Sequence, residues 1–180
     1  MGALKDGKTM DFSMETYTIY PYEELKPFKQ ISYDEYDKNR EEYNNKVKNG
    51  EQVIISPMNA GSYNVGDCEF DVTECGMSPL YFVSRNTDHR FTKGLVKNEL
   101  GYFYDSKLDR MAPIIYATIE GENIIPAILS GNQDNSGNWH TVTAVGEIKY
   151  GNGSFVLNQL DFENKEKNPP IVKLMNNITE

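Results

Sequence analysis

Apolar residues recur at helical spacing in one early stretch of the chain. Ser32 opens this stretch and Glu35 follows three residues later, which is the pattern of a capping box at a helix N-terminus. The apolar positions that follow share one helical face: Tyr33, Tyr36, Tyr43 and Val47. Gly50 suits the C-terminal cap. The pattern predicts one long helix over 33–48, whose tyrosine stripe is either a buried face or an aromatic binding platform.

The rest of the chain is dominated by strand patterns. Val53-Ile54-Ile55 reads as a buried strand, and Asn59 to Asp67 reads as a loop rich in Gly, Asn and Ser. Strand-like runs then cover 114–119, 124–129, 140–149 and 155–162, with Asn152-Gly153 as a hairpin turn between the last two. These four runs predict an antiparallel meander. Pro169-Pro170 ends it, and Ile171 to Met175 is expected to add a short edge element.

Together these elements predict the fold class α+β, with one long N-terminal helix and a mainly antiparallel C-terminal sheet. The chain has 180 residues, the size of one domain. We expect a flexible segment over 1–14 and a single domain over 15–180. Two stretches are less clear: 75–86 fits a helix entered at Ser78-Pro79 or a strand, and 92–100 looks helical.

Charge narrows the choice of partners. The net charge is −9, and the longest basic cluster is Lys46-Val47-Lys48. Binding to nucleic acid needs clustered Lys and Arg, so we expect no nucleic-acid partner. The acidic surface either imitates nucleic acid or keeps the protein soluble. No apolar run is long enough to span a membrane, and the N-terminus lacks a signal-peptide core, so a cytoplasmic location is expected, with a mature secreted form left open.

The motifs of common cofactor and metal sites are missing. The chain has no phosphate-binding loop, no dinucleotide fingerprint and no His-Glu-x-x-His. It has two histidines, His89 and His140, and two cysteines, Cys68 and Cys75. We therefore expect no cofactor and no metal. The two cysteines can pair with each other or remain free thiols.

One set of residues suits cysteine catalysis. Such chemistry needs a thiolate, a base that forms it and a group that orients the base. Cys75 is followed by Gly76 and a possible helix, His140 opens a strand, and Asn158 lies on the expected partner strand. Asp161 is a second candidate for the orienting group.

These residues sit in segments that resemble a known family. Residues 139–146, Trp-His-Thr-Val-Thr-Ala-Val-Gly, and residues 153–158, Gly-Ser-Phe-Val-Leu-Asn, resemble the His and Asn hairpin of papain-like cysteine peptidases. The likeness is greatest to the bacterial type that trims double-glycine leader peptides. Residues 74–80 resemble the Cys-Gly nucleophile segment, and residues 112–116 resemble the strand before the His loop.

The resemblance implies a papain-like fold and hydrolysis of a peptide amide. Cys75 would be the nucleophile, His140 the general base, and Asn158, or else Asp161, the group that orients His140. Three features differ from the family: no Gln lies shortly before Cys75, Pro79 falls where the nucleophile helix should be running, and the sequence before Cys75 is longer than expected. Cys68 is an alternative nucleophile.

The sequence also fits a protein without catalytic activity. Its twelve tyrosines and its acidity suit a bacterial or phage-borne binding or inhibitor protein that engages a peptide or protein partner. A ligand pocket under the Asn59–Asp67 loop is a third possibility.

Overall fold

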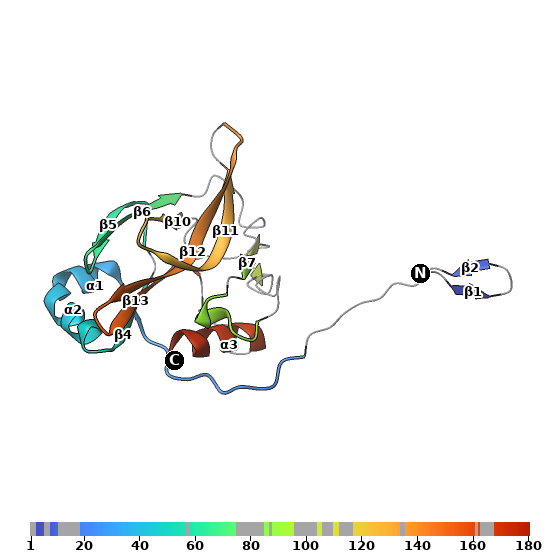
Figure 1. Cartoon of the computed structure of the whole chain (residues 1–180), viewed down its shortest axis with the longest axis horizontal. Helices are drawn as coiled ribbons and strands as arrows, with labels where there is room; N and C mark the ends of the chain where they lie inside the picture. Colours follow the sequence, from blue (N-terminus) through green and yellow to red (C-terminus); the bar gives the residue numbers. More distant parts are fainter. Residues whose placement is uncertain are drawn as a thin grey trace.

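The computed structural model describes residues 3–5, 8–10, 19–56, 58–74, 85–86, 88–95, 104–105, 110–111, 117–133, 136–160, 162 and 168–180. Its central feature is a nine-stranded, mostly antiparallel sheet that curls on itself (Figure 1). Seven strands follow in the order β3-β4-β13-β12-β10-β6-β5, while β11 pairs with β12 and β7 pairs with β11. The strands are β3 Gln30–Ile31, β4 Gln52–Ile55, β5 Gly61–Val65, β6 Cys68–Glu74, β7 Arg85–Asn86, β10 Ala117–Glu120, β11 Ile125–Gln133, β12 Trp139–Tyr150 and β13 Gly153–Asn158.

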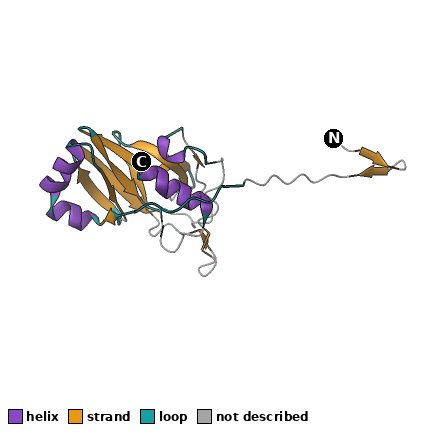
Figure 2. Cartoon of the chain, turned by 90° about the horizontal axis from the view of Figure 1, so that it is seen from below, coloured by secondary structure: helices purple, strands orange, loops and turns teal. Residues whose placement is uncertain are grey.

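The helices are short. They are α1 Tyr33–Lys38, α2 Arg40–Lys48, the 3-10 helix η2 Arg90–Thr92, and α3 Pro169–Ile178. Two further strand pairs stand outside the main sheet, β1 Ala3–Lys5 with β2 Lys8–Met10 and β8 Tyr104–Asp105 with β9 Arg110–Met111. The first pair lies apart from the rest, within the segment expected to be loose (Figures 1 and 2). The α+β class and the mainly antiparallel sheet are therefore confirmed.

Helices cover both faces of the central strands β4 and β13. Along β4, Val53 and Ile55 belong to one buried apolar cluster and Ile54 to the other. The helices α1 and α2 contribute Tyr36 and Val47 to the first cluster, whereas α3 contributes four apolar residues to the second: Ile171, Leu174, Met175 and Ile178. Burial on both faces explains the uninterrupted apolar run of β4, which pairs in parallel with β13.

The β12–β13 hairpin forms as predicted, but its turn is Gly151-Asn152 rather than the predicted Asn152-Gly153. The register joins Tyr150 to Gly153 and Val145 to Asn158. Within the turn, Gly151 adopts a left-handed φ of 63°, so it is this glycine that the turn conformation requires. The other half of the expected meander is different: β10 pairs with β6 and β12, and β11 pairs with β12 and β7.

The prediction of one long helix over 33–48 is wrong, because the helix is broken at Asn39. This residue has φ −120° and ψ 30°, and it is both the C-cap of α1 and the N-cap of α2. Its side-chain amide donates to the Glu35 carbonyl at 3.0 Å, a local hydrogen bond that competes with a continuous helix. The start of the helix is as predicted, since the Ser32 hydroxyl accepts from the Glu35 N–H at 3.1 Å.

Two other expectations are corrected. The segment Asn59–Asp67 contains strand β5, which pairs with β6 through a two-residue turn whose Gly66 has φ 61°. Ile171–Met175 belongs to helix α3 rather than to an edge element, because the prolines occupy the first positions of a helix, where their missing N–H costs nothing. Residues 75–84 and 96–100 lie outside the described residues. Among the described helices, none is long and apolar enough to cross a membrane.

Candidate functional site

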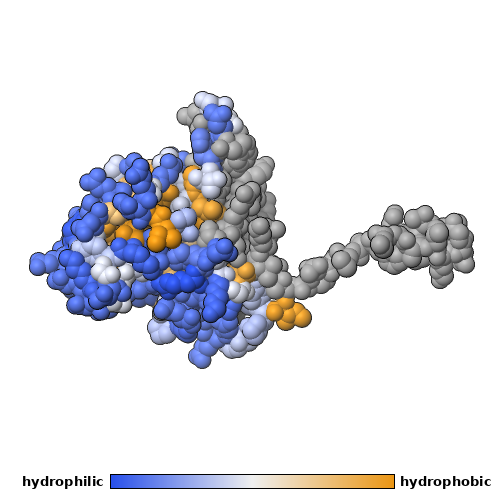
Figure 3. All heavy atoms as spheres, viewed as in Figure 1, coloured by the Kyte–Doolittle hydropathy of each residue, from blue (hydrophilic) through white to orange (hydrophobic). Residues whose placement is uncertain are grey.

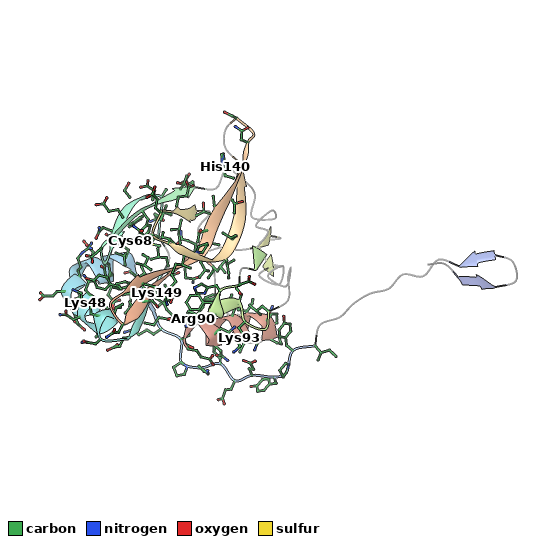
Figure 4. All side chains as sticks on the ribbon, in the orientation of Figure 1. Lys48, Cys68, Arg90, Lys93, His140 and Lys149 are labelled. Atoms are coloured by element: carbon green, nitrogen blue, oxygen red, sulfur yellow. The ribbon has the colours of Figure 1, made fainter. Side chains whose placement is uncertain are left out.

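Of the predicted catalytic residues, the structure describes His140 and Asn158, and it places them apart. His140 is exposed near the start of β12, where it pairs with Asn132 of β11. Asn158, at the end of β13, pairs with Val145. Val145 is five positions beyond His140 along β12, which corresponds to roughly 17 Å at the rise of a strand. Figure 4 likewise shows His140 at the far end of β12 from Lys149. Cys75 and Asp161 lie outside the described residues.

The Asn158 side chain is fully buried and has structural partners. Its carbonyl oxygen accepts from the Leu160 N–H, and its amide donates to the Leu160 carbonyl, both at 3.1 Å. The amide also lies 3.4 Å from Ser56 Oγ and from Gln30 Oε1. These bonds hold the backbone just after β13 against the neighbouring strands. In this arrangement Asn158 does not orient His140, contrary to the expectation from the sequence.

Cys68, the alternative nucleophile, is a core residue. It begins β6 opposite Val65 and belongs to the apolar cluster beneath α1 and α2. Burial raises the pKa of its thiol, which keeps the sulfur protonated and a poor nucleophile at neutral pH. Figure 4 places it within the body of the fold. Its behaviour is that of a small buried hydrophobe.

The most perturbed ionisable group among the described residues is Glu147 on β12. Its side chain is 2% exposed and accepts hydrogen bonds from Arg90 at 2.9 Å and from His89 Nε2 at 3.0 Å. Lys149 Nζ lies 2.8 Å away. Burial raises the pKa of Glu147, but hydrogen bonds from Lys149, Arg90 and Ser154 outweigh it and bring the pKa to about 2. This carboxylate therefore anchors the segment that carries η2 to the sheet.

An acidic groove lies over β5, β6 and the turn from β10 to β11. Its volume is about 890 Å³. Five carboxylates line it: Asp67, Glu69, Asp71, Glu120 and Glu122. The remaining lining residues are aromatic or polar, and include Tyr33, Tyr63, Phe70, Ser62, Asn64 and Asn123. We call this hollow the acidic groove. Hydrophilic side chains dominate the surface above β5 and β6 (Figure 3).

Strand register explains how the carboxylates converge. Along β6, Phe70 and Val72 point into the core, so Glu69 and Asp71 face outward. Asp71 lies directly opposite Glu120 on β10 and Ser62 on β5, and the Ser62 hydroxyl donates to it at 2.6 Å. The carboxylates of this row thus come from two adjacent strands, β6 and β10, and Ser62 of β5 extends the row as a polar side chain.

No Lys or Arg lines the acidic groove, and no ion pair between described residues includes any of its five carboxylates. Among the described residues, the five carboxylates therefore have no cationic side chain at ion-pair distance. The aromatic wall is well ordered: the rings of Tyr33 and Tyr63 meet edge-to-face at 4.6 Å, and Tyr63 stacks on Phe70 at 5.8 Å. Such a surface favours a positively charged ligand.

Sequence reasoning missed the acidic groove, although part of its signal was present. The alternation from Cys68 to Glu74 is that of a strand with one polar face. Glu120 and Glu122, in contrast, join this face only through the pairing of β10 with β6. Among the described residues, no group of three or more His, Cys, Asp or Glu is arranged to hold a metal ion. Comparisons with protein-family models, curated proteins and solved structures found no match for this chain.

Proposed function

We propose that this protein is a non-catalytic binding protein, and that its acidic groove holds a cationic segment of a partner protein. The observation that carries the proposal is a groove of about 890 Å³ whose described lining includes five carboxylates and no Lys or Arg. Lys and Arg side chains would relieve the repulsion among these carboxylates. Their aliphatic stems would also contact the rings of Tyr33 and Tyr63, which pack on the buried Phe70.

The size and charge of the groove favour a protein segment over other cationic ligands. A volume near 890 Å³ is at the upper end for a small-molecule site and is open along the sheet. The net charge of −9 would steer a basic partner toward the protein from a distance, and salt would weaken this attraction. An inhibitor of a basic partner and a simple binding module both fit these features.

The papain-like architecture and the peptidase activity remain the competing proposal. It depends on Cys75, whose neighbours the described structure does not include. Support for it would have to come from the chemistry of that thiol, and a test is given in the Discussion.

Binding of a basic peptide tests the proposal directly. The probe is a fluorescent nonalysine peptide, followed by fluorescence anisotropy at low and moderate salt. The variant Asp71→Asn/Glu120→Gln removes two groove charges. Its control, Glu41→Gln/Glu74→Gln, removes two exposed carboxylates that do not line the groove, so both proteins have the same net charge.

We expect the groove variant to bind about tenfold more weakly than the control, which corresponds to about 1.4 kcal/mol. Equal affinity of the two variants would show that only the overall charge attracts the peptide, and the groove would then have no binding role.

A further inference from the structure

His89 lies at a junction between three elements. Its ring is 8% exposed, and its Nε2 is 3.0 Å from a carboxylate oxygen of Glu147 on β12. Its other nitrogen, Nδ1, accepts a hydrogen bond of 3.3 Å from the Phe91 N–H and so caps the start of η2. The ring also packs against the Phe91 ring, with 4.3 Å between centroids. Both nitrogens of one buried imidazole thus hold the same short segment in place.

These two bonds define the protonation state of the ring. Because Nδ1 accepts from a backbone N–H, it carries no proton, and the single proton of the neutral ring must lie on Nε2, facing Glu147. A second proton can go only to Nδ1. A proton on Nδ1 would point at the Phe91 N–H. Two donors would then face each other, and the hydrogen bond that caps η2 would be lost.

The segment that His89 caps packs against α3 and β11 and is joined to β12 through Glu147. Phe91 and Leu95 are buried in the apolar cluster that α3 completes. From α3, the Asn177 side-chain amide donates to the carbonyls of Phe91 and Lys93 at 2.8 and 2.9 Å. The segment has little regular structure of its own, since η2 spans only Arg90–Thr92. Its position therefore depends strongly on these few polar contacts.

The charges that face His89 come from β12 and from its own segment. Glu147 favours a positive ring, whereas Arg90 and Lys149 oppose it. Burial is the strongest influence and lowers the pKa of His89 below its ordinary value near 6.5, in the same direction as the two cations. The folded protein thus favours the neutral His89 ring. Acidification, which protonates the ring, therefore destabilises the packing of this segment.

We propose that His89 is an acid-sensitive latch, in which protonation of Nδ1 breaks the cap on Phe91 and releases residues 88–95 from β12 and α3. The geometry that supports this proposal is that both ring nitrogens are hydrogen-bonded, Nε2 to the Glu147 carboxylate and Nδ1 to the Phe91 N–H. The sheet itself would stay folded, because β12 and β13 remain paired and Lys149, on β12 itself, still balances Glu147 after Arg90 has left with the segment. This device is separate from the acidic groove and does not depend on the proposed binding function.

Hydrogen exchange and NMR test the latch in the whole chain. The protection factor of the Phe91 amide is measured from pH 7.5 to 5.0, after correction for intrinsic exchange. Two variants accompany the wild type. His89→Asn retains a side-chain acceptor suited to the cap but does not titrate in this range. His140→Gln removes the other histidine, which is exposed on β12, so that any remaining titration belongs to His89.

We expect the wild type and His140→Gln to lose at least about tenfold in Phe91 protection on acidification, and His89→Asn to lose none. The ring shifts should also show the proton on Nε2 at neutral pH. Loss of protection in His89→Asn equal to that of the wild type, constant protection in the wild type, or a proton on Nδ1 at neutral pH would each overturn the latch. The pH dependence of Phe91 protection and the position of the ring proton are both measured on the wild type alone. The latch can therefore still be tested if His89→Asn folds poorly.

Discussion

Asp71 and Glu120 lie directly opposite each other on adjacent antiparallel strands, with like charges on the same exposed face. Directly opposed like charges destabilise a sheet by roughly 0.2–1 kcal/mol. No described ion pair relieves this repulsion. An unfavourable pair in the floor of a groove is what a binding surface for cations would show, because stability is given up where a ligand supplies the missing charge.

The first prediction is that Glu120→Gln stabilises the free protein. Gln keeps the size of the side chain and removes the charge opposite Asp71, so the free energy of unfolding should rise by about 0.2–1 kcal/mol. Urea unfolding at low salt measures it. The gain should shrink in about 1 M NaCl, where charges on the surface are screened within ~3 Å.

Glu74→Gln provides the matched control for this prediction. Glu74 lies on the same strand as Asp71 but opposite Ala117, which has no charge. It should change the unfolding free energy less than Glu120→Gln does. If both substitutions stabilise the protein equally, the cause is the general surplus of negative charge rather than the Asp71–Glu120 pair.

A second prediction concerns the acid stability that Glu147 contributes. The pKa of the Glu147 carboxyl group is near 4.5 without its partners, as in the unfolded chain, and is about 2 in the fold. The folded state thus binds this proton less readily than the unfolded state. The ionised Glu147 therefore makes its full contribution to the free energy of unfolding above about pH 4.5. This contribution is lost as the pH falls from 4.5 toward 2. The difference in pKa corresponds to about 3 kcal/mol.

Glu147→Gln should therefore flatten the stability profile below about pH 4.5. At pH 7 we expect it to lower the unfolding free energy by about 1–3 kcal/mol, because the Gln side chain offers one acceptor oxygen to the donors of His89, Arg90 and Lys149 and turns an NH2 group toward the others. Urea unfolding at several pH values between 7 and 3 gives the profile. A variant profile parallel to that of the wild type would contradict this account of Glu147.

The sequence predicted those parts of the fold that depend on neighbours in the chain. The Ser32 cap, the buried strand at Val53-Ile54-Ile55 and the β12–β13 hairpin all follow from local residue pattern, and all are present. The break at Asn39 could not be predicted in this way. It lets Arg40 bridge to β5, where its guanidinium donates to the Asn64 carbonyl at 3.0 Å and to the Asn64 side chain at 2.8 Å. That contact joins elements 24 residues apart and closes part of a sheet edge.

The acidic groove could not be predicted from the sequence for a similar reason. Asp71 and Glu120 are distant in sequence, and only the β6–β10 pairing makes them neighbours. For α3 the difficulty was different, because Pro169-Pro170 is compatible both with the end of a sheet and with the first turn of a helix. The apolar residues at 171, 174, 175 and 178 have helical spacing. In the structure they form the face of α3 that packs against the sheet.

A third prediction separates the two cysteines. Cys68 is buried and burial raises the pKa of its thiol, so it should react with iodoacetamide only when the protein unfolds. Cys68→Ala should label at the wild-type rate in native conditions. Any rapid labelling at pH 6 would then come from Cys75, and the peptidase proposal requires that it disappear in both Cys75→Ala and His140→Ala. If Cys68→Ala abolishes rapid labelling, our account of its burial is wrong.

A fourth prediction concerns the close approach of the β12–β13 turn to α2. A Cβ on Gly153 would lie 2.6 Å from the Val47 carbonyl oxygen and would also collide with the Glu51 carbonyl. Neither obstacle is a flexible side chain, so Gly153→Ala should cost about 1–3 kcal/mol of unfolding free energy. Asn152→Ala, at the adjacent exposed position, is the control and should cost less. Thermal or urea unfolding of the pair would decide, and equal stability of the two variants would mean that the turn can move away from α2.

The last prediction assigns Asn158 a structural role. The side chain both donates to and accepts from the backbone of Leu160, in a site with no exposure to solvent. Asn158→Asp preserves its shape but replaces the donor with an oxygen that faces the Leu160 carbonyl. A buried carboxylate beside a carbonyl is unfavourable, and the unsatisfied acceptor adds about 1–3 kcal/mol. We therefore expect this variant to unfold at a clearly lower urea concentration than the wild type at pH 7.

The same substitution distinguishes this role from a catalytic one. A catalytic Asn158 would only orient His140 and would not hold the backbone after β13, so this role predicts a variant as stable as the wild type at both pH values. A structural Asn158 predicts instead that stability returns as the pH falls and the new carboxyl becomes protonated and can donate to the Leu160 carbonyl. Urea unfolding of Asn158→Asp at pH 7 and pH 5, beside the wild type, separates the two, because only the structural role makes the variant's deficit smaller at the lower pH.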